Sequence, residues 1–129
     1  MTPESADYLD RAKKCLADAE QIAGATSLHH IAARETYLAA YHAAEAYVFE
    51  RTRRTVKTHR GLRSEFLRLA RDEPRIAREF QTFLAKAYEF KSNADYGVGP
   101  TAPSITSEDA CEAIGTASRF VECIATILA

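Results

Sequence analysis

The residues best placed to do chemistry lie near the end of a segment expected to form a helix. Its apolar stripe, spaced by three and four residues, continues past Leu84 and Ala87 to Lys91 and then, one turn later, to Asp95. A lysine and an aspartate on the inward side of a helix are unusual, because buried charge is costly unless it is paired. The cluster is therefore either an ion pair that closes the helix, with Tyr96 hydrogen-bonded at its tip, or a functional site.

The four histidines are the next candidates for chemistry. His29 and His30 begin a predicted helix and have no Cys, His or carboxylate partner at a metal-ligand spacing, so we expect them to be solvated or capping. His42 lies among small residues and should face another helix or a subunit interface. His59 should fix a turn through hydrogen bonds. The sequence contains no GxSxG, Walker-type or HExxH motif, and we expect no metal and no cofactor.

A basic segment covers residues 51–60 and contains no acid. Residues 51–78 carry a net charge of +7 and the rest of the chain −8. Such a segment can contact phosphates, but it lacks the aromatic residues that stack on bases. It is either a solvated face that pairs with the acidic part of another molecule or a surface that binds nucleic acid or a nucleotide. The candidate contacts are Arg53, Arg54, Lys57, His59 and Arg60.

The elements that must position these residues are helices. Apolar residues recur with the helical period, and nothing alternates with the period of a strand. Helices are predicted over residues 6–23, 29–51, 62–71, 74–96 and from 106 or 107 to the end of the chain. Thr2 or Ser5 should cap the first, and Asp72 the fourth. The fold expected is an all-α antiparallel bundle of four long helices and one short helix.

Composition sets the class of protein. Apolar residues make up 47% of the chain and charged residues 27%, and 129 residues suit a single domain over 1–129. No apolar run approaches the roughly 20 residues that span a bilayer, so a soluble cytoplasmic protein is expected. Cys15, Cys111 and Cys123 fall within helical apolar patterns, and we expect buried thiols rather than disulfides.

Three segments together resemble the HEPN family, and in particular its small bacterial and archaeal members. Residues 37–46, Tyr-Leu-Ala-Ala-Tyr-His-Ala-Ala-Glu-Ala, are similar to the family's YYAxFHAAEA helix and are preceded by Arg34. Residues 58–62, followed by Phe66, are similar to its THxG turn. Residues 91–96, Lys-Ser-Asn-Ala-Asp-Tyr, are similar to its RxxADY helix end. The matching segments occur in the family's order and cover nearly the whole chain.

The resemblance implies a helical bundle of four to five helices that commonly dimerises. Many members of the family are metal-independent ribonucleases of toxin–antitoxin or RNA-directed defence systems, often neutralised by a minimal nucleotidyltransferase. Their signature is an arginine followed four to six residues later by a histidine. Here Lys91 takes the arginine position, no histidine follows it, and Asp95 and Tyr96 occupy the histidine region. The spacing from Arg54 to His59 fits formally, but it falls in the basic segment, and we interpret it as a coincidence.

Two functions therefore follow as hypotheses. In the first, the chain is a divergent ribonuclease with Lys91, Asp95 and Tyr96 as catalytic residues. In the second, it is a non-catalytic homodimeric module that binds RNA, a nucleotide or a protein. A nucleotidyltransferase partner fits both. A weaker third idea is a small-molecule pocket, against simple core packing, at Tyr37, Tyr41, Phe83 and Tyr88.

Overall fold

Five helices form the part of the chain that this computed structural model describes, which is residues 1–96 and 105–129, with only the backbone path given for 93–96. They are α1 (Pro3–Ala25), α2 (His29–Thr52), α3 (His59–Ala70), α4 (Arg78–Tyr96) and α5 (Ser107–Leu128). Within these residues no strand occurs. The all-helical fold with one short helix, α3, is confirmed. Residues 97–104, which fall between the fourth and fifth predicted helices, lie outside the described residues.

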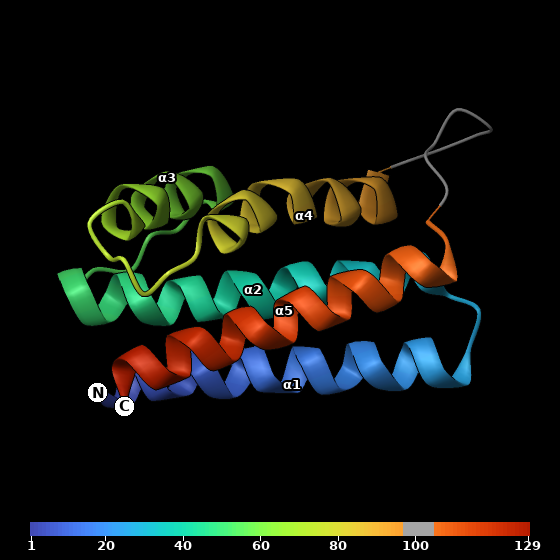
Figure 1. The fold of residues 1–129 in the computed structure, drawn as a ribbon, viewed down its shortest axis with the longest axis horizontal. Coiled ribbons are helices and arrows are strands. Elements are labelled where there is room, and N and C mark those ends of the chain that lie inside the picture. Colours follow the sequence, from blue (N-terminus) through green and yellow to red (C-terminus); the bar gives the residue numbers. More distant parts are fainter. Residues whose placement is uncertain (97–104) are drawn as a thin grey trace.

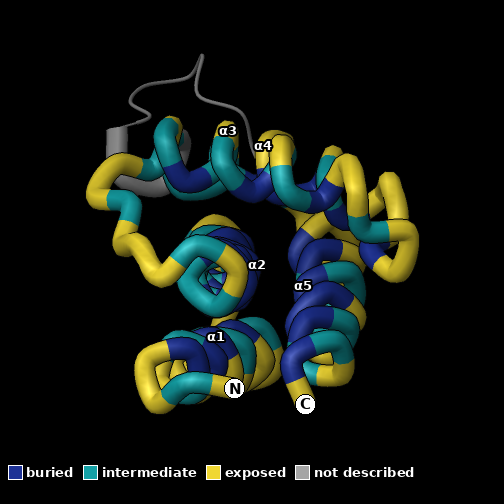
Figure 2. Tube along the Cα trace, turned by 90° about the vertical axis from the view of Figure 1, so that its left-hand side faces the viewer, coloured by how far each residue is buried: buried dark blue, intermediate teal, exposed yellow. Residues whose placement is uncertain are grey.

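The bundle is antiparallel. α1 and α4 run in one direction and α2 and α5 in the other, and both chain termini lie at the same end (Figure 1). α2 is the central helix, in contact with each of the other four. α3 and α4 lie on one side of α2 and α1 on the opposite side (Figures 1 and 2). The buried residues of all five helices face this shared interior (Figure 2).

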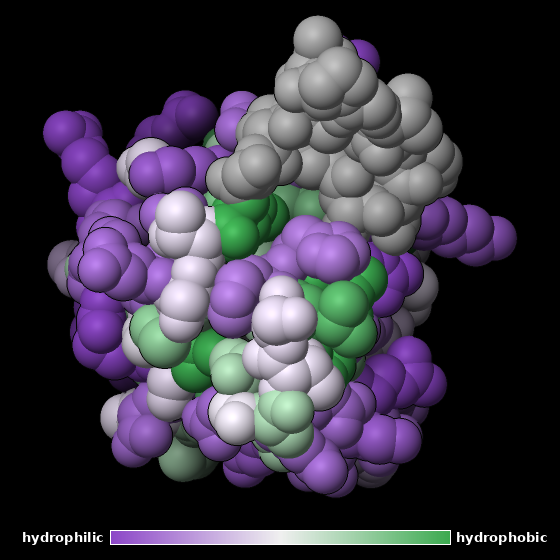
Figure 3. All heavy atoms as spheres, turned by 90° about the vertical axis from the view of Figure 1, so that its right-hand side faces the viewer, coloured by the Kyte–Doolittle hydropathy of each residue, from purple (hydrophilic) through white to green (hydrophobic). Residues whose placement is uncertain are grey.

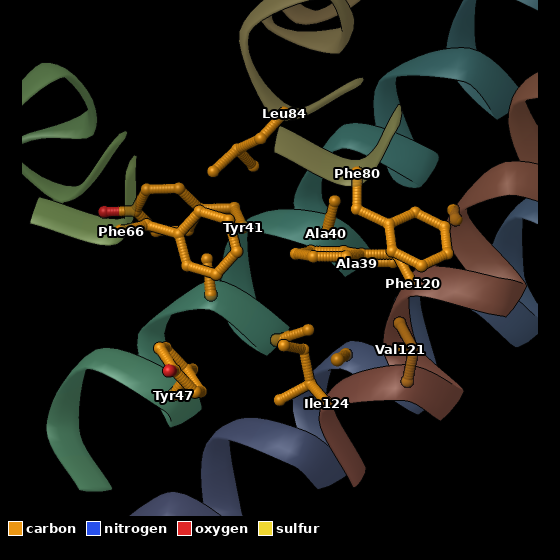
Figure 4. Close-up of a cluster of buried hydrophobic side chains, with 14 of the residues drawn as sticks. Ala39, Ala40, Tyr41, Tyr47, Phe66, Phe80, Leu84, Phe120, Val121 and Ile124 are labelled. Atoms are coloured by element: carbon orange, nitrogen blue, oxygen red, sulfur yellow. The ribbon is translucent and has the colours of Figure 1, made fainter. Parts of the chain in front are cut away.

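Small residues on α2 let its neighbours approach closely. Alanine adds no bulk beyond its methyl group and has the highest helix propensity. Seven alanines of α2 are fully buried: Ala32, Ala33, Ala39, Ala40, Ala43, Ala44 and Ala46. The larger core side chains come mostly from the surrounding helices. Phe120 of α5 contacts Phe66 of α3 and Phe80 of α4, each with ring centroids 5.5 Å apart (Figure 4).

Side chains cap two helix starts, and the first of these caps was predicted. The Thr2 hydroxyl accepts a hydrogen bond from the backbone N–H of Ser5 at 3.2 Å, so Thr2 is the cap of α1. Thr106 and Asp109 form a reciprocal capping box at the start of α5. These side chains satisfy backbone donors that an isolated helix start leaves unpaired.

Two other predicted starts were wrong. α3 begins at His59 rather than at 62, because Thr58 caps it. α4 begins at Arg78 rather than at 74, so Asp72 does not cap it. The intervening segment forms turns instead, in which the Glu73 carboxylate accepts hydrogen bonds from the Arg75 backbone at 3.2 Å and guanidinium at 2.8 Å. This local pairing offers the backbone an alternative to a helical turn.

The three cysteines are free thiols, but they are not all buried as expected. Cys15 and Cys123 are partly buried, and Cys111 is exposed on α5. Burial, together with the nearby Glu35 carboxylate, raises the pKa of Cys15 to about 11. The Cys15 thiol therefore stays protonated and unreactive at neutral pH.

The surface mixes polar and apolar side chains at the end where α1 joins α2 (Figure 3). Leu28, the residue that precedes α2, is 48% exposed there. Among the described helices, none has an apolar stretch that could cross a bilayer.

Glu50 ties the N-terminus to α2. Its carboxylate accepts hydrogen bonds from the Thr2 backbone N–H at 3.0 Å and from the hydroxyl of the buried Ser5 at 2.8 Å. Arg53 lies 3.2 Å away. These donors, led by the Thr2 backbone N–H, lower the pKa of Glu50 from 4.5 to about 2. The ionised carboxylate therefore stabilises the folded state.

The Glu50→Gln variant should lower the free energy of unfolding by about 1–2 kcal/mol at pH 7, because hydrogen bonds to a charged acceptor are lost. Since the folded-state pKa is depressed, this contribution is full above pH 4.5 and is lost as the pH falls towards 2. Urea denaturation at pH 7 and pH 3 measures both effects. The exposed Glu20→Gln on α1 is the control, and an equal effect of the two substitutions would contradict the assignment.

Candidate functional site

His59 lies in the first turn of α3, and a side-chain cap fixes the start of this helix. The Thr58 hydroxyl accepts a hydrogen bond from the Gly61 backbone N–H at 3.0 Å. A Cβ atom at Gly61 would lie 2.7 Å from that hydroxyl oxygen and 3.0 Å from a methyl group of Val56. Only glycine therefore fits at position 61 without displacing the cap.

His59 is held against α2 by two tyrosines spaced one helical turn apart. Its Nδ1 atom lies 2.7 Å from the Tyr37 hydroxyl, so one of the two groups donates a hydrogen bond to the other. The ring also stacks on Tyr41, with centroids 4.3 Å apart. Tyr88 of α4 lies on the same cluster, with its centroid 6.0 Å from that of His59. The half-buried imidazole thus packs against side chains from α2 and α4.

Two cationic side chains border this histidine. Arg63 follows His59 by one turn of α3, and its guanidinium lies over the Tyr88 ring, 4.1 Å from the centroid. Its Nη1 atom is buried and has no hydrogen-bond partner. Lys91 is half-buried one turn after Tyr88 on α4, close enough for its charge to act on His59. The site therefore joins α2, α3 and α4.

The surroundings favour a neutral imidazole. Burial, then the positive charges of Lys91 and Arg63, lowers the pKa of His59 below 6.5, and Glu45 acts in the opposite direction. Burial also raises the pKa of Tyr37 to about 12, an effect that the nearby Arg63 opposes. Tyr37 therefore stays protonated. With Nδ1 of His59 engaged by Tyr37, proton exchange falls to Nε2.

The predicted site residues separate into three groups. Lys91 and His59, assigned to different candidate sites, lie in one cluster. The side chains of Asp95 and Tyr96 lie outside the described residues, so their roles stay predictions. The remaining basic residues are exposed before or at the start of α3, and Arg53 pairs with Glu50 at 3.2 Å. They are Arg53, Arg54, Lys57 and Arg60.

Sequence reasoning missed Arg63 as a site residue. Its signal was the four-residue spacing from His59, which places both side chains on one helical face once α3 is known to begin at His59. Three of the four aromatic residues considered for a pocket pack against one another. Tyr37 lies with its ring centroid 5.9 Å from that of Tyr41 and 5.5 Å from that of Tyr88.

The part of the chain whose side chains are described contains no candidate metal centre. No three His, Cys, Asp or Glu residues are placed there to share an ion. The chemistry that this cluster can support is binding of an anion by Lys91 and Arg63 beside a neutral histidine.

Comparison with known proteins identifies the architecture. The HEPN domain profile matches residues 5–127. The crystal structure of TT1696 from Thermus thermophilus superposes with a TM-score of 0.75 and 18% sequence identity, covering 97% of this chain and 98% of that one. At this identity the superposition supports the fold alone. A comparison with curated protein sequences gives no match.

The Gly61→Ala variant should lower the free energy of unfolding by about 1–2 kcal/mol, because the new methyl group displaces the Thr58 cap. Gly24→Ala is the matched control, since a Cβ there meets nothing within 4 Å. That substitution should be neutral or stabilise α1 by up to about 1 kcal/mol. Thermal and urea unfolding measure both variants. Equal effects would show that the close approach at Gly61 does not matter.

The Lys91→Gln variant should raise the pKa of His59, because the largest charge effect on this imidazole is removed. Burial remains, as do Arg63 and His42, which also lower the pKa, so the value should stay below 6.5. NMR titration of the imidazole resonances measures the change. The exposed Lys86→Gln on the same helix is the control. An unchanged His59 titration in Lys91→Gln would place Lys91 outside the cluster.

Proposed function

The chain belongs to the HEPN family, and on this basis we propose that it is the RNA-directed member of a cytoplasmic prokaryotic toxin–antitoxin pair. In this proposal it acts as a homodimer and cleaves RNA at a divergent site. A minimal nucleotidyltransferase is the protein partner that neutralises it.

One observation carries the proposal, which is the proximity of His59 to Lys91. The family signature places a cation and a histidine a few residues apart on one segment. Here Lys91 comes from α4, and the histidine comes from the start of α3. Arg63 supplies a second positive charge. A cation and a proton-transfer group are therefore combined in space although the linear motif is missing.

The chemistry of RNA cleavage fits this set. Attack of a 2′-hydroxyl on the neighbouring phosphorus needs a group that accepts the hydroxyl proton, and the lowered pKa of His59 keeps its imidazole available as that base. Lys91 and Arg63 stabilise the negative charge that grows on the phosphate oxygens. In the proposal, Asp95 or Tyr96 orders the site.

A non-catalytic module that binds RNA, a nucleotide or a protein is the second candidate. The exposure of Arg54, Lys57 and Arg60 favours it, because these side chains can contact phosphates directly. Such contacts hold a polyanion without cleaving it. The salt dependence of binding then reports how many of them are made.

The test is RNA cleavage in EDTA by the wild-type protein and by single variants. Lys91→Gln and His59→Gln should each reduce the cleavage rate by about 10²–10³-fold, since a charge-stabilising or proton-transfer group is lost. Asp95→Ala tests the second part of the predicted site. Lys86→Gln is the control, and circular dichroism checks that each variant folds.

The outcomes separate the candidates. Cleavage that survives in both Lys91→Gln and His59→Gln would contradict the proposed site. RNA that stays intact but binds, and whose binding weakens when Arg54, Lys57 and Arg60 are all changed to Gln, would instead support the binding module. Light scattering of the same samples measures whether the protein is a dimer.

A further inference from the structure

A second histidine lies beside the proposed site, held by a carboxylate. The Nδ1 atom of His42 is 2.6 Å from the Glu45 carboxylate oxygen, and the two side chains are 22% and 12% exposed. A carboxylate on Nδ1 fixes the orientation of an imidazole and leaves Nε2 to exchange protons with a bound molecule. His42 is thus both oriented and accessible.

Tyr41 connects this pair to His59. Its ring stacks on His59 at 4.3 Å between centroids and meets the His42 ring edge-on at 5.7 Å. The two imidazoles therefore contact the same phenol ring from different directions. Glu45 follows Tyr41 by one turn of α2, so the carboxylate also faces the cluster.

His42 and Glu45 also act on His59 electrostatically. Positive charge on His42 lowers the pKa of His59, and the Glu45 carboxylate raises it. The site therefore combines one imidazole that its surroundings keep neutral, that of His59, with a second imidazole whose Nδ1 atom lies against a carboxylate. One proton donor and one proton acceptor are the two groups that phosphodiester transesterification requires.

We propose that His42, oriented by Glu45, is the proton donor of this site, an inference that rests on the proposed function. His59 accepts the proton of the 2′-hydroxyl as the O2′–P bond forms. The P–O5′ bond breaks, and His42 gives its proton to the departing 5′ oxygen. The products are a 2′,3′-cyclic phosphate and a 5′-hydroxyl, and proton exchange with water restores both histidines.

A proton donor can be recognised by the leaving group it serves. The dinucleotide uridylyl-3′,5′-adenosine loses an alkoxide, which needs a proton. Uridine 3′-(4-nitrophenyl phosphate) loses nitrophenolate, which departs without one. The His42→Gln variant should reduce kcat/KM for the dinucleotide by about 10²–10⁴-fold and leave the nitrophenyl ester within about threefold of wild type. His59→Gln should impair both substrates.

Two further variants complete the experiment. Glu45→Gln keeps the shape of the side chain and should show the same preference for the nitrophenyl ester with a smaller loss, as expected of a positioning residue. It also serves as the second variant if His42→Gln does not fold. The exposed His30→Gln on the same helix is the matched control and should behave as wild type with both substrates.

Three other outcomes would contradict the inference, each for a different reason. Equal loss on both substrates in His42→Gln would make His42 a structural residue, and no loss on either would remove it from the site. In both cases the proposed function stands, because the wild-type protein still cleaves RNA. If the wild-type protein cleaves neither substrate, the result contradicts both the proposed function and this inference.

Discussion

The rest of the structure depends on α2, because this helix must pack against the other four helices at once. Its different faces carry residues of different size. Buried alanines such as Ala40 and Ala44 allow close approach of the backbone, whereas Tyr37 and Tyr41 extend towards α3 and α4. Because consecutive residues of a helix point in different directions, one segment serves both purposes. The cluster around His59 exists because the aromatic part of α2 faces the start of α3.

The fold was predictable because its main signal is local. The apolar period marks each helix, and caps such as Thr106 mark where one begins. The errors arose where a side chain has two uses. Thr58 and Gly61 are typical of a turn, but here the Thr58 side chain caps α3 and Gly61 leaves room for that cap. Pro74 is suited to a first helical turn, but Glu73 pairs with Arg75 and holds that segment in turns instead.

The site was predictable only in parts. In the sequence, Lys91 is unusual as a charge on an apolar stripe, and His59 is part of an expected turn. Their proximity depends on how α3 and α4 pack on α2, which no local pattern encodes. A signature defined by spacing along one segment cannot detect a histidine supplied by another helix. Arg63 was hidden for a related reason, since its spacing from His59 has meaning only within α3.

Stability and chemistry are coupled in this cluster because the same contacts produce both. The stacking of Tyr41 on His59 holds the start of α3 against α2, and burial of the imidazole is the largest contribution to the lowered pKa of His59. Protonating this imidazole places a third positive charge beside Lys91 and Arg63 in a partly buried site. A bound anion would offset this cost. Without one, the cluster is most stable when His59 is neutral.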